Sequence, residues 1–278
     1  MMKYWILSLA FLVGCAGAPK TETPAPVETY ALPTTLDEAL ASPFRTPVNK
    51  ERDSFRHPKE TLDFFGLQPN MTVIEISPSG GWYTEILAPY LATQGRYIAA
   101  ATPVSVYPGG RKFQETVGAR PELKDKITVT DFAPPTQVAI AEAGSADMVL
   151  TFRNVHNWMT ADGAQAAFDS FFKALKPGGI LGVVEHRENA KKKEDPKAKN
   201  GYVTEKQVIR LAQKAGFKLV NKSEINANPK DTKDHPQGVW NLPPSYRDGD
   251  KDRAKYAAIG ESDRMTLKFV KPAAAKKK

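Results

Sequence analysis

Residues 73–85 read Val-Ile-Glu-Ile-Ser-Pro-Ser-Gly-Gly-Trp-Tyr-Thr-Glu. This segment begins as a run of β-branched residues, passes through a turn of small residues and continues with helical spacing of its apolar residues. In open parallel sheets, ligands bind just beyond such strand ends, where small side chains and free helix N–H groups face the ligand. A tight turn that only needs Gly80 and Gly81 is the equally weighted alternative.

The same alternation of short apolar runs and longer amphipathic runs continues along the chain on both sides of this segment. It predicts an α/β fold with a doubly wound, mostly parallel sheet of seven strands. The expected strands are Thr72–Ile76, Arg96–Ala101, Ile127–Thr130, Asp147–Phe152, Ile180–Glu185, Phe217–Lys222 and Arg264–Val270. The expected helices are Thr35–Ala41, a segment within Arg52–Phe65 that starts near Pro58, Trp82–Leu91, Ala161–Leu175 and Thr204–Ala215.

With 278 residues of ordinary globular composition, the chain suits one large domain, expected over residues 34–272. Residues 224–263 are rich in Asn, Asp, Pro and Gly and are too long for an ordinary connection. This segment is expected to be a functional or lid-like insertion before the last strand, with a helical piece near residues 250–258. Residues 273–278 form a basic tail.

The N-terminus has the pattern of an export signal. Residues 1–14 combine a cationic start with an apolar run that is too short to span a membrane. The run ends in Leu-Val-Gly-Cys, which resembles the bacterial lipobox, so Cys15 is expected to carry lipid. Residues 15–33 then form a flexible linker. The chain is therefore predicted to be an exported lipoprotein on the periplasmic face of the outer membrane. The alternative is an ordinary cleaved signal peptide.

The net charge of +8 does not by itself predict a nucleic-acid partner. The lysines gather at residues 191–199 and 276–278, and no basic stripe with interleaved aromatic residues accompanies them. Cys15 is the only cysteine, so no disulfide can form within the chain. Contact with the membrane is expected through the lipid anchor only.

Two motifs resemble class I S-adenosylmethionine-dependent methyltransferases. In the first, Glu75 falls on the acidic position of their cofactor loop, Ser77 and Ser79 on its first two glycines, and Gly81 on its third. The second is Phe-Phe-Lys-Ala-Leu-Lys-Pro-Gly-Gly-Ile-Leu-Gly-Val-Val-Glu at residues 171–185, which is similar to the helix, turn and fifth strand of that family. The Pro-x-Gly-Gly-Trp-Tyr loop also resembles a group of predicted, often exported bacterial methyltransferases.

The resemblance covers roughly residues 52–272 and implies a Rossmann-like methyltransferase fold with S-adenosylmethionine as cofactor. It implies that Asp131 accepts a hydrogen bond from the adenine amino group. The cofactor-binding residues that it implies are Glu75, Ser77, Ser79, Gly80, Gly81 and Asp131. The chain departs from the family where Ala101-Thr102 stands in place of the acidic residue that usually holds the ribose.

Polar residues follow the fourth expected strand, where the resemblance places the methyl group and its acceptor. His156 is a candidate general base, since imidazole titrates near neutral pH. Arg153 is a candidate ligand of an anionic substrate, and Asn154 is a candidate for orienting it. In the alternative interpretation, His156 and Asn157 only cap the following helix or satisfy the loop backbone.

Glu185 and His186 close the fifth strand and are expected at the same rim as His156, which makes a catalytic site there more probable. The spacing of His156, Glu185 and His186 matches no close ligand motif, and no metal is predicted. Nicotinamide and nucleotide-hydrolase functions fit poorly, because no G-x-G-x-x-G follows the first strand and no Walker loop is present.

The sequence thus predicts a methyltransferase that acts on an unidentified small molecule in the cell envelope. The alternative is a non-catalytic ligand-binding or envelope-interaction lipoprotein that retains the fold.

Overall fold

The computed structural model describes residues 30–106, 111, 113–115, 123 and 125–273. The predicted signal peptide, Cys15, most of the linker and residues 274–278 lie outside this described part.

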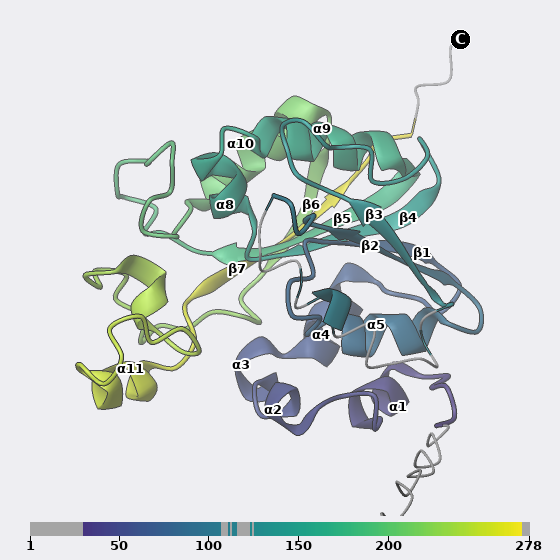
Figure 1. Ribbon diagram of the computed structural model, residues 1–278. Coiled ribbons are helices and arrows are strands. Elements are labelled where there is room, and N and C mark those ends of the chain that lie inside the picture. Colours follow the sequence, from purple (N-terminus) through teal and green to yellow (C-terminus); the bar gives the residue numbers. More distant parts are fainter. Residues whose placement is uncertain (1–29, 107–110, 112, 116–122, 124, 274–278) are drawn as a thin grey trace, which may run out of the picture.

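A single sheet of seven strands forms the centre of the domain (Figure 1), in the order β3-β2-β1-β4-β5-β7-β6. Strands β1 to β5 pair in parallel, and β7 runs antiparallel to both β5 and β6. The order reverses between β1 and β4, which is where open sheets of this kind bind ligands. The predicted fold class is confirmed. The strands are β1 Thr72–Ile76, β2 Arg96–Ala101, β3 Ile127–Asp131, β4 Ala146–Phe152, β5 Leu175–His186, β6 Lys218–Ser223 and β7 Arg264–Val270.

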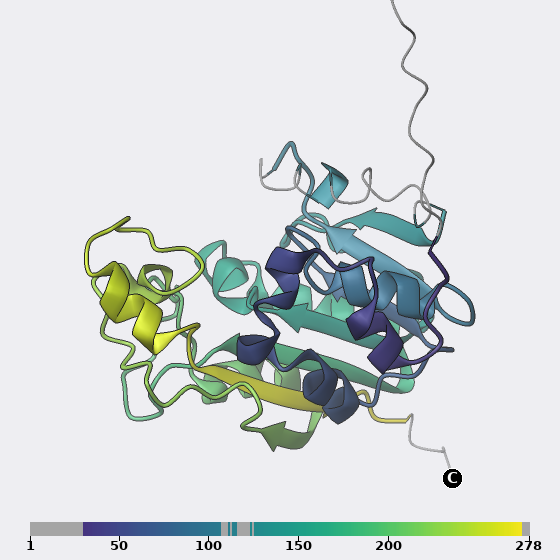
Figure 2. The ribbon, with the colours of Figure 1, turned by 90° about the horizontal axis from the view of Figure 1, so that it is seen from below.

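Helices cover both faces of the sheet. Figure 1 shows α8, α9 and α10 on one face and α1, α4 and α5 on the other, and Figure 2 shows the second group from below. Each face has its own apolar core, with Phe168 and Phe171 in one and Phe65 and Leu87 in the other. The helices are α1 Leu36–Ala41, α2 Pro47–Lys50, α3 Asp53–Arg56, α4 Pro58–Phe65, α5 Thr84–Leu91, α8 Val155–Thr160, α9 Ala164–Ala174, α10 Glu205–Ala215, η1 Gly238–Asn241 and α11 Arg253–Ile259.

The helix starts and ends follow local chemistry. Thr204 caps α10 by accepting from the backbone N–H of Gln207, and Gly216 closes the helix in the left-handed conformation. Gly66 closes α4 in the same way. Four short helices, α2, α3, α8 and η1, were not predicted from the sequence. Each has one full turn or little more, too short for a periodic apolar pattern to show.

The segment of residues 224–263 lies beyond one end of the strands, as the yellow-green lobe on the left of both views (Figures 1 and 2). Arg187, just after β5, joins it to the sheet through two hydrogen bonds to the carboxylate of Asp263. Buried Asp231 accepts from Tyr202 and from the backbone N–H of Asp263. These contacts fix the segment over the strand ends. Among the described helices, none has the length and apolar character that a membrane crossing requires.

Candidate functional site

A cavity of about 740 Å³ opens at the carboxyl ends of the parallel strands. Its walls come from the ends of β1, β2, β4 and β5, from the segment after β3, from α3 and α8, and from residues 224–263. The volume lies within the range of small-molecule sites, and the position is the switch point of the sheet. Trp240, Pro243 and Pro244 of the inserted segment form part of the wall. The cavity is therefore the candidate ligand site.

The loop after β1 bends into the cavity wall through alternating left-handed residues. Ser77 has φ 48°, Ser79 has φ 54° and Gly81 has φ 76°. Only glycine adopts this region without steric cost, so the three alternating glycines of the methyltransferase loop have a direct structural reason. In this chain Ser77 and Ser79 adopt the left-handed region despite their side chains, at a cost of roughly 1–2 kcal/mol each. Both serines line the cavity.

Glu75, the next-to-last residue of β1, is a buried carboxyl that also touches the cavity. Its Oε2 atom accepts from the hydroxyl of Tyr97 at 2.5 Å and from that of Thr84 at 3.1 Å. Burial raises the pKa of Glu75 to about 7, although both hydrogen bonds favour the charged form. Glu75 therefore links β1 to β2 and to α5, and it fixes where the loop begins.

The remaining predicted cofactor residues are Gly80 and Gly81 in this loop and Asp131 at the end of β3. Thr102 and Phe132 belong to the described residues that line the cavity. Gly80, Gly81 and Asp131 do not line it. Asp131 is the last residue of β3 and is exposed. The hydroxyls of Ser77 and Thr102 lie 3.4 Å apart, so the loop is connected to the end of β2.

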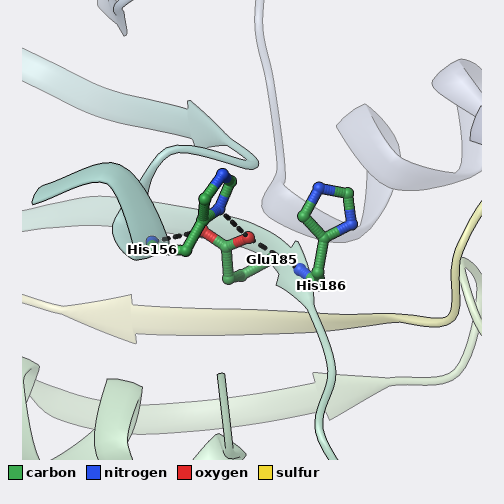
Figure 3. Close-up of side chains that lie close together, drawn as sticks. All are labelled: His156, Glu185 and His186. Carbon is green, nitrogen blue, oxygen red and sulfur yellow. Dashed lines mark hydrogen bonds and ion pairs between the residues drawn. The ribbon is translucent and has the colours of Figure 1, made fainter. Parts of the chain in front are cut away.

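His156 and Glu185 form a buried hydrogen-bonded pair at the rim of the sheet (Figure 3). The Nδ1 atom of His156 lies 3.0 Å from Oε1 of Glu185. Because a carboxylate only accepts, Nδ1 carries the proton, and Nε2 is left as the acceptor on the other side of the ring. His156 also lines the cavity. This is the arrangement of a general base whose tautomer is fixed by a carboxylate.

Glu185 also accepts hydrogen bonds from three backbone N–H groups. Its Oε2 accepts from the backbone N–H of Val155 at 2.5 Å and of His156 at 3.3 Å, and its Oε1 accepts from the N–H of His186 at 2.8 Å. A carboxylate at the N-terminus of α8 stabilises the helix through its free N–H groups. Glu185 thus sets the position of the helix that carries His156.

The side chains of His156, Glu185 and His186 could in principle hold a metal ion, since one ligand atom from each lies within 4.8 Å of the others. Both oxygens of Glu185 are already acceptors of N–H groups, and the Nδ1 atom of His186 lies 2.5 Å from the hydroxyl of Ser262. A metal would have to displace these bonds. Burial and the positive charge of neighbouring groups lower the pKa of His186 well below its usual value, so this ring stays neutral. The geometry fits a histidine–carboxylate pair better than a metal site.

Arg153 and Asn154 join β4 to α8, and both line the cavity. Asn154 donates from Nδ2 to the backbone oxygen of Ile76 at 3.0 Å, so it ties the end of β4 to the end of β1. Arg153 has φ 62° and a side chain that is about one quarter exposed. The structure therefore brings the catalytic candidates Arg153, Asn154, His156 and His186 to the wall of one cavity, and it places Glu185 in contact with His156.

Arg56 and Glu261 also line the cavity, although no sequence pattern indicates them as site residues. Arg56 belongs to α3 and Glu261 to the inserted segment, 205 residues further along the chain. Their Nε and Oε2 atoms lie 3.2 Å apart. The two residues are far apart along the chain, and Arg56 lies in a helix that was not predicted. No local sequence pattern therefore indicates that they form a pair.

No protein-family model matches the chain, and no curated protein matches it by sequence. Solved structures do resemble it. An S-adenosylmethionine-dependent methyltransferase from Aquifex aeolicus is 15% identical with a TM-score of 0.55, covering 85% of this chain and 98% of its own. A putative sarcosine dimethylglycine methyltransferase from Galdieria sulphuraria is 12% identical with a TM-score of 0.52, covering 83% and 91%.

The [4+2]-cyclase SpnF resembles the chain to the same degree, at 14% identity and a TM-score of 0.54, covering 90% of this chain and 98% of its own. At these identities the likeness shows the fold, and the chain has the Rossmann-like fold of class I methyltransferases. The reaction has to be argued from the site, since one fold supports several chemistries.

Proposed function

We propose that this protein transfers a methyl group from S-adenosylmethionine to a small molecule in the cell envelope. The observation that carries the proposal is that one cavity joins the left-handed loop after β1 to the His156–Glu185 pair. The loop contains the residues that the resemblance associates with the cofactor, and positions 77, 79 and 81 have the positive φ angles that glycine adopts without strain. The histidine pair supplies the base that a hydroxyl or amine acceptor requires.

The cavity suits the cofactor in size, and Ser77 and Ser79 keep the loop backbone in the conformation of the glycine pattern. When bound, S-adenosylmethionine supplies an electrophilic methyl group on a positively charged sulfur. The chain has to hold the acceptor in line with that group and remove a proton from it.

His156 performs the proton transfer in this proposal. Its Nε2 accepts the proton of the acceptor hydroxyl or amine, while Nδ1 keeps its hydrogen bond to Glu185. The negative charge of Glu185 stabilises the imidazolium that forms. The ring centres of His156 and Trp240 lie 6.1 Å apart, so the inserted segment reaches the cavity wall beside the base.

The envelope location rests on the N-terminal sequence. A cationic start, an apolar run and a single cysteine after Leu-Val-Gly support lipid attachment at Cys15. The linker of residues 15–33 would then connect the membrane surface to the domain.

Calorimetric titration of the full chain in detergent with S-adenosylmethionine and S-adenosylhomocysteine tests the cofactor. Both are expected to bind, and Gly81→Val is expected to weaken binding at least tenfold, because Gly81 has φ 76°. Arg210→Gln is the matched control, since Arg210 pairs with Glu194 on the exposed face of α10. Absence of heat with both ligands would remove the enzyme proposal.

A second candidate is a binding protein that retains the fold without methyl transfer. Thr102 lines the cavity where the family usually has a ribose-binding acid, and Asp131 lies outside the cavity wall among the described residues. Both features favour weaker cofactor binding. Binding of S-adenosylhomocysteine without production of S-adenosylhomocysteine from S-adenosylmethionine in small-molecule extracts would favour this candidate.

A further inference from the structure

Four arginines surround the carboxylate of Glu261 at one end of the cavity. The Nη2 atom of Arg52 lies 2.6 Å from Oε1, and three atoms face Oε2: Nη1 of Arg264 at 3.0 Å, Nε of Arg56 at 3.2 Å and Nη1 of Arg153 at 3.9 Å. Within the described part of the chain, every ion pair of these arginines is made with Glu261. The cluster thus has four positive charges and one negative charge.

This excess charge is largely removed from water. The side chains of Arg56, Arg264 and Glu261 are only 3–4% exposed. Burial opposes the ionisation of Glu261, yet the positive charges of Arg56 and Arg264 outweigh burial and lower its pKa to about 2. Burial and the positive charge of Arg153 lower the pKa of Arg56 well below its usual value. Like charges so close together in a poorly hydrated place are unfavourable unless an anion joins them.

Arg56 also has a free donor in this place. Its Nη2 atom is buried and has no hydrogen-bond partner, and its guanidinium lies 4.6 Å from the centre of the Trp82 ring. Buried guanidinium N–H groups are normally hydrogen-bonded, since leaving one unpaired is costly. Arg56, Arg153 and Glu261 all line the cavity. Arg56 therefore combines an unpaired buried N–H group with a place in the cavity wall.

The carboxylate of Asp53 does not supply a second negative charge to the arginine cluster. Asp53 also lies on α3, but both of its oxygens are bound at 2.6 Å by the guanidinium of Arg45. That pair neutralises itself. Among the described residues, Arg56 and Arg153 form ion pairs with Glu261 alone, which leaves a ligand in the cavity as a source of a further anion.

We propose that Arg56 and Arg153, supported by Arg52 and Arg264, bind the carboxylate or phosphate group of the methyl acceptor. The acceptor is then an anionic small molecule, a conclusion that rests on the proposed methyl transfer. Guanidinium groups bind both anions through paired N–H donors.

The position of the cluster favours the acceptor as the source of the anion. Arg153 follows β4 and Arg264 begins β7, and the sheet order places these strands on the opposite side of β1 from β2 and β3. The resemblance assigns the adenosine part of the cofactor to the ends of β2 and β3. Arg153 is also three residues from His156, so an anion at Arg153 places the rest of the molecule near the base.

Thermal unfolding of the full chain without S-adenosylmethionine tests the anion site. Sodium phosphate and sodium malonate are titrated against sodium chloride at constant ionic strength. Both are expected to raise the melting temperature in a saturable way. Arg153→Gln is expected to weaken the apparent affinity for phosphate about tenfold, and Arg153→Lys less. Arg210→Gln, on the exposed face of α10, is expected to leave it unchanged.

The Arg153 variants are expected to fold, because its side chain is about one quarter exposed and its closest carboxylate oxygen is 3.9 Å away. Glu261→Gln gives the reciprocal test. It removes the only negative charge of the cluster, so the melting temperature without phosphate should be lower than that of the wild type. The rise in melting temperature on adding phosphate should be larger in Glu261→Gln than in the wild type. Equal phosphate responses in the wild type and Arg153→Gln would overturn the proposal.

Two cofactor analogues separate the acceptor from the cofactor as the source of the anion. S-adenosylhomocysteine has a carboxylate, and 5′-methylthioadenosine lacks the amino-acid part. Equal affinity of wild type and Arg153→Gln for S-adenosylhomocysteine supports the acceptor. Selective loss of S-adenosylhomocysteine binding, with 5′-methylthioadenosine unaffected, would overturn it. Failure of both analogues to bind would count against the proposed function but leave the phosphate result intact.

Discussion

Glu185 and His156 are joined by a hydrogen bond of 3.0 Å between a fully buried carboxyl oxygen and Nδ1 of the imidazole. The same carboxyl accepts the backbone N–H groups that begin α8. Its position therefore determines both where the histidine lies and which of its nitrogens carries the proton. This double role connects the end of β5 to the candidate chemistry after β4.

We predict that Glu185→Gln lowers methyl transfer by about 10²–10⁴-fold, in line with the loss of a positioned acid–base group. Cofactor affinity should change little, since Glu185 does not line the cavity among the described residues. Single-turnover transfer from labelled S-adenosylmethionine and a parallel calorimetric titration measure the two effects.

A nitrogen NMR spectrum of histidine-labelled protein gives a readout that does not depend on the acceptor. His156 should show a protonated Nδ1 in the wild type and a changed tautomer population in Glu185→Gln. His186 is the internal control, because its Nδ1 contacts Ser262 instead. An unchanged His156 signal would remove the tautomer argument.

The fold was predictable because its determinants are local. Strands such as Thr72–Ile76 show their period, and helices such as Glu205–Ala215 show their period and their caps, within about a dozen residues. The rim position of His156 and Glu185 was also predictable, since the carboxyl ends of parallel strands share one edge. The helix that carries His156 was not, because six residues are too few to show a periodic pattern.

The arginine cluster was hidden from sequence inspection for a different reason. Arg56 and Glu261 come from segments that meet only after the sheet has formed, and the charged residues around each of them in the sequence do not indicate the other. Arg153 alone was noticed, because it directly follows a buried strand. Such a pair forms only in the tertiary structure, and the spacing of residues along the chain does not reveal it.

Ser79 offers a test of the loop conformation. Its φ of 54° is unfavourable for a residue with a side chain, so Ser79→Gly should raise the free energy of unfolding by about 0.5–1 kcal/mol. Ser79→Val should lower it, because a β-branched residue fits the left-handed region poorly. Urea unfolding measures both. Equal stability of the three proteins would show that the loop relaxes without strain.

Cys15 is the test of the envelope assignment. Cys15→Ser should abolish incorporation of labelled palmitate and release the chain from the membrane fraction, because the acyl chains are the proposed anchor. Ser42→Ala, in the folded domain, is the control and should keep the label. Membrane association of Cys15→Ser equal to that of the wild type would contradict the anchor.

Glu75 predicts a specific dependence of stability on pH. Its pKa is raised by burial from 4.5 to about 7, so the folded state binds this proton more tightly than the unfolded state. The stabilising contribution is therefore complete below about pH 4.5 and is lost as the pH rises through 7. The total loss is about 3 kcal/mol, from the free energy of one pKa unit.

Glu75→Gln isolates this contribution, since glutamine resembles the protonated side chain and keeps an acceptor for Tyr97 and Thr84. The difference in unfolding free energy between wild type and Glu75→Gln should decline from pH 4.5 to 7.5, as measured by urea unfolding at each pH. Other titrating groups are the same in both proteins, so their contributions to the unfolding free energy cancel in this difference. The hydrogen bond from Tyr97 lowers the pKa of Glu75, so Tyr97→Phe should move the decline to higher pH. A difference that stays flat would mean that Glu75 is charged in the folded protein throughout this range.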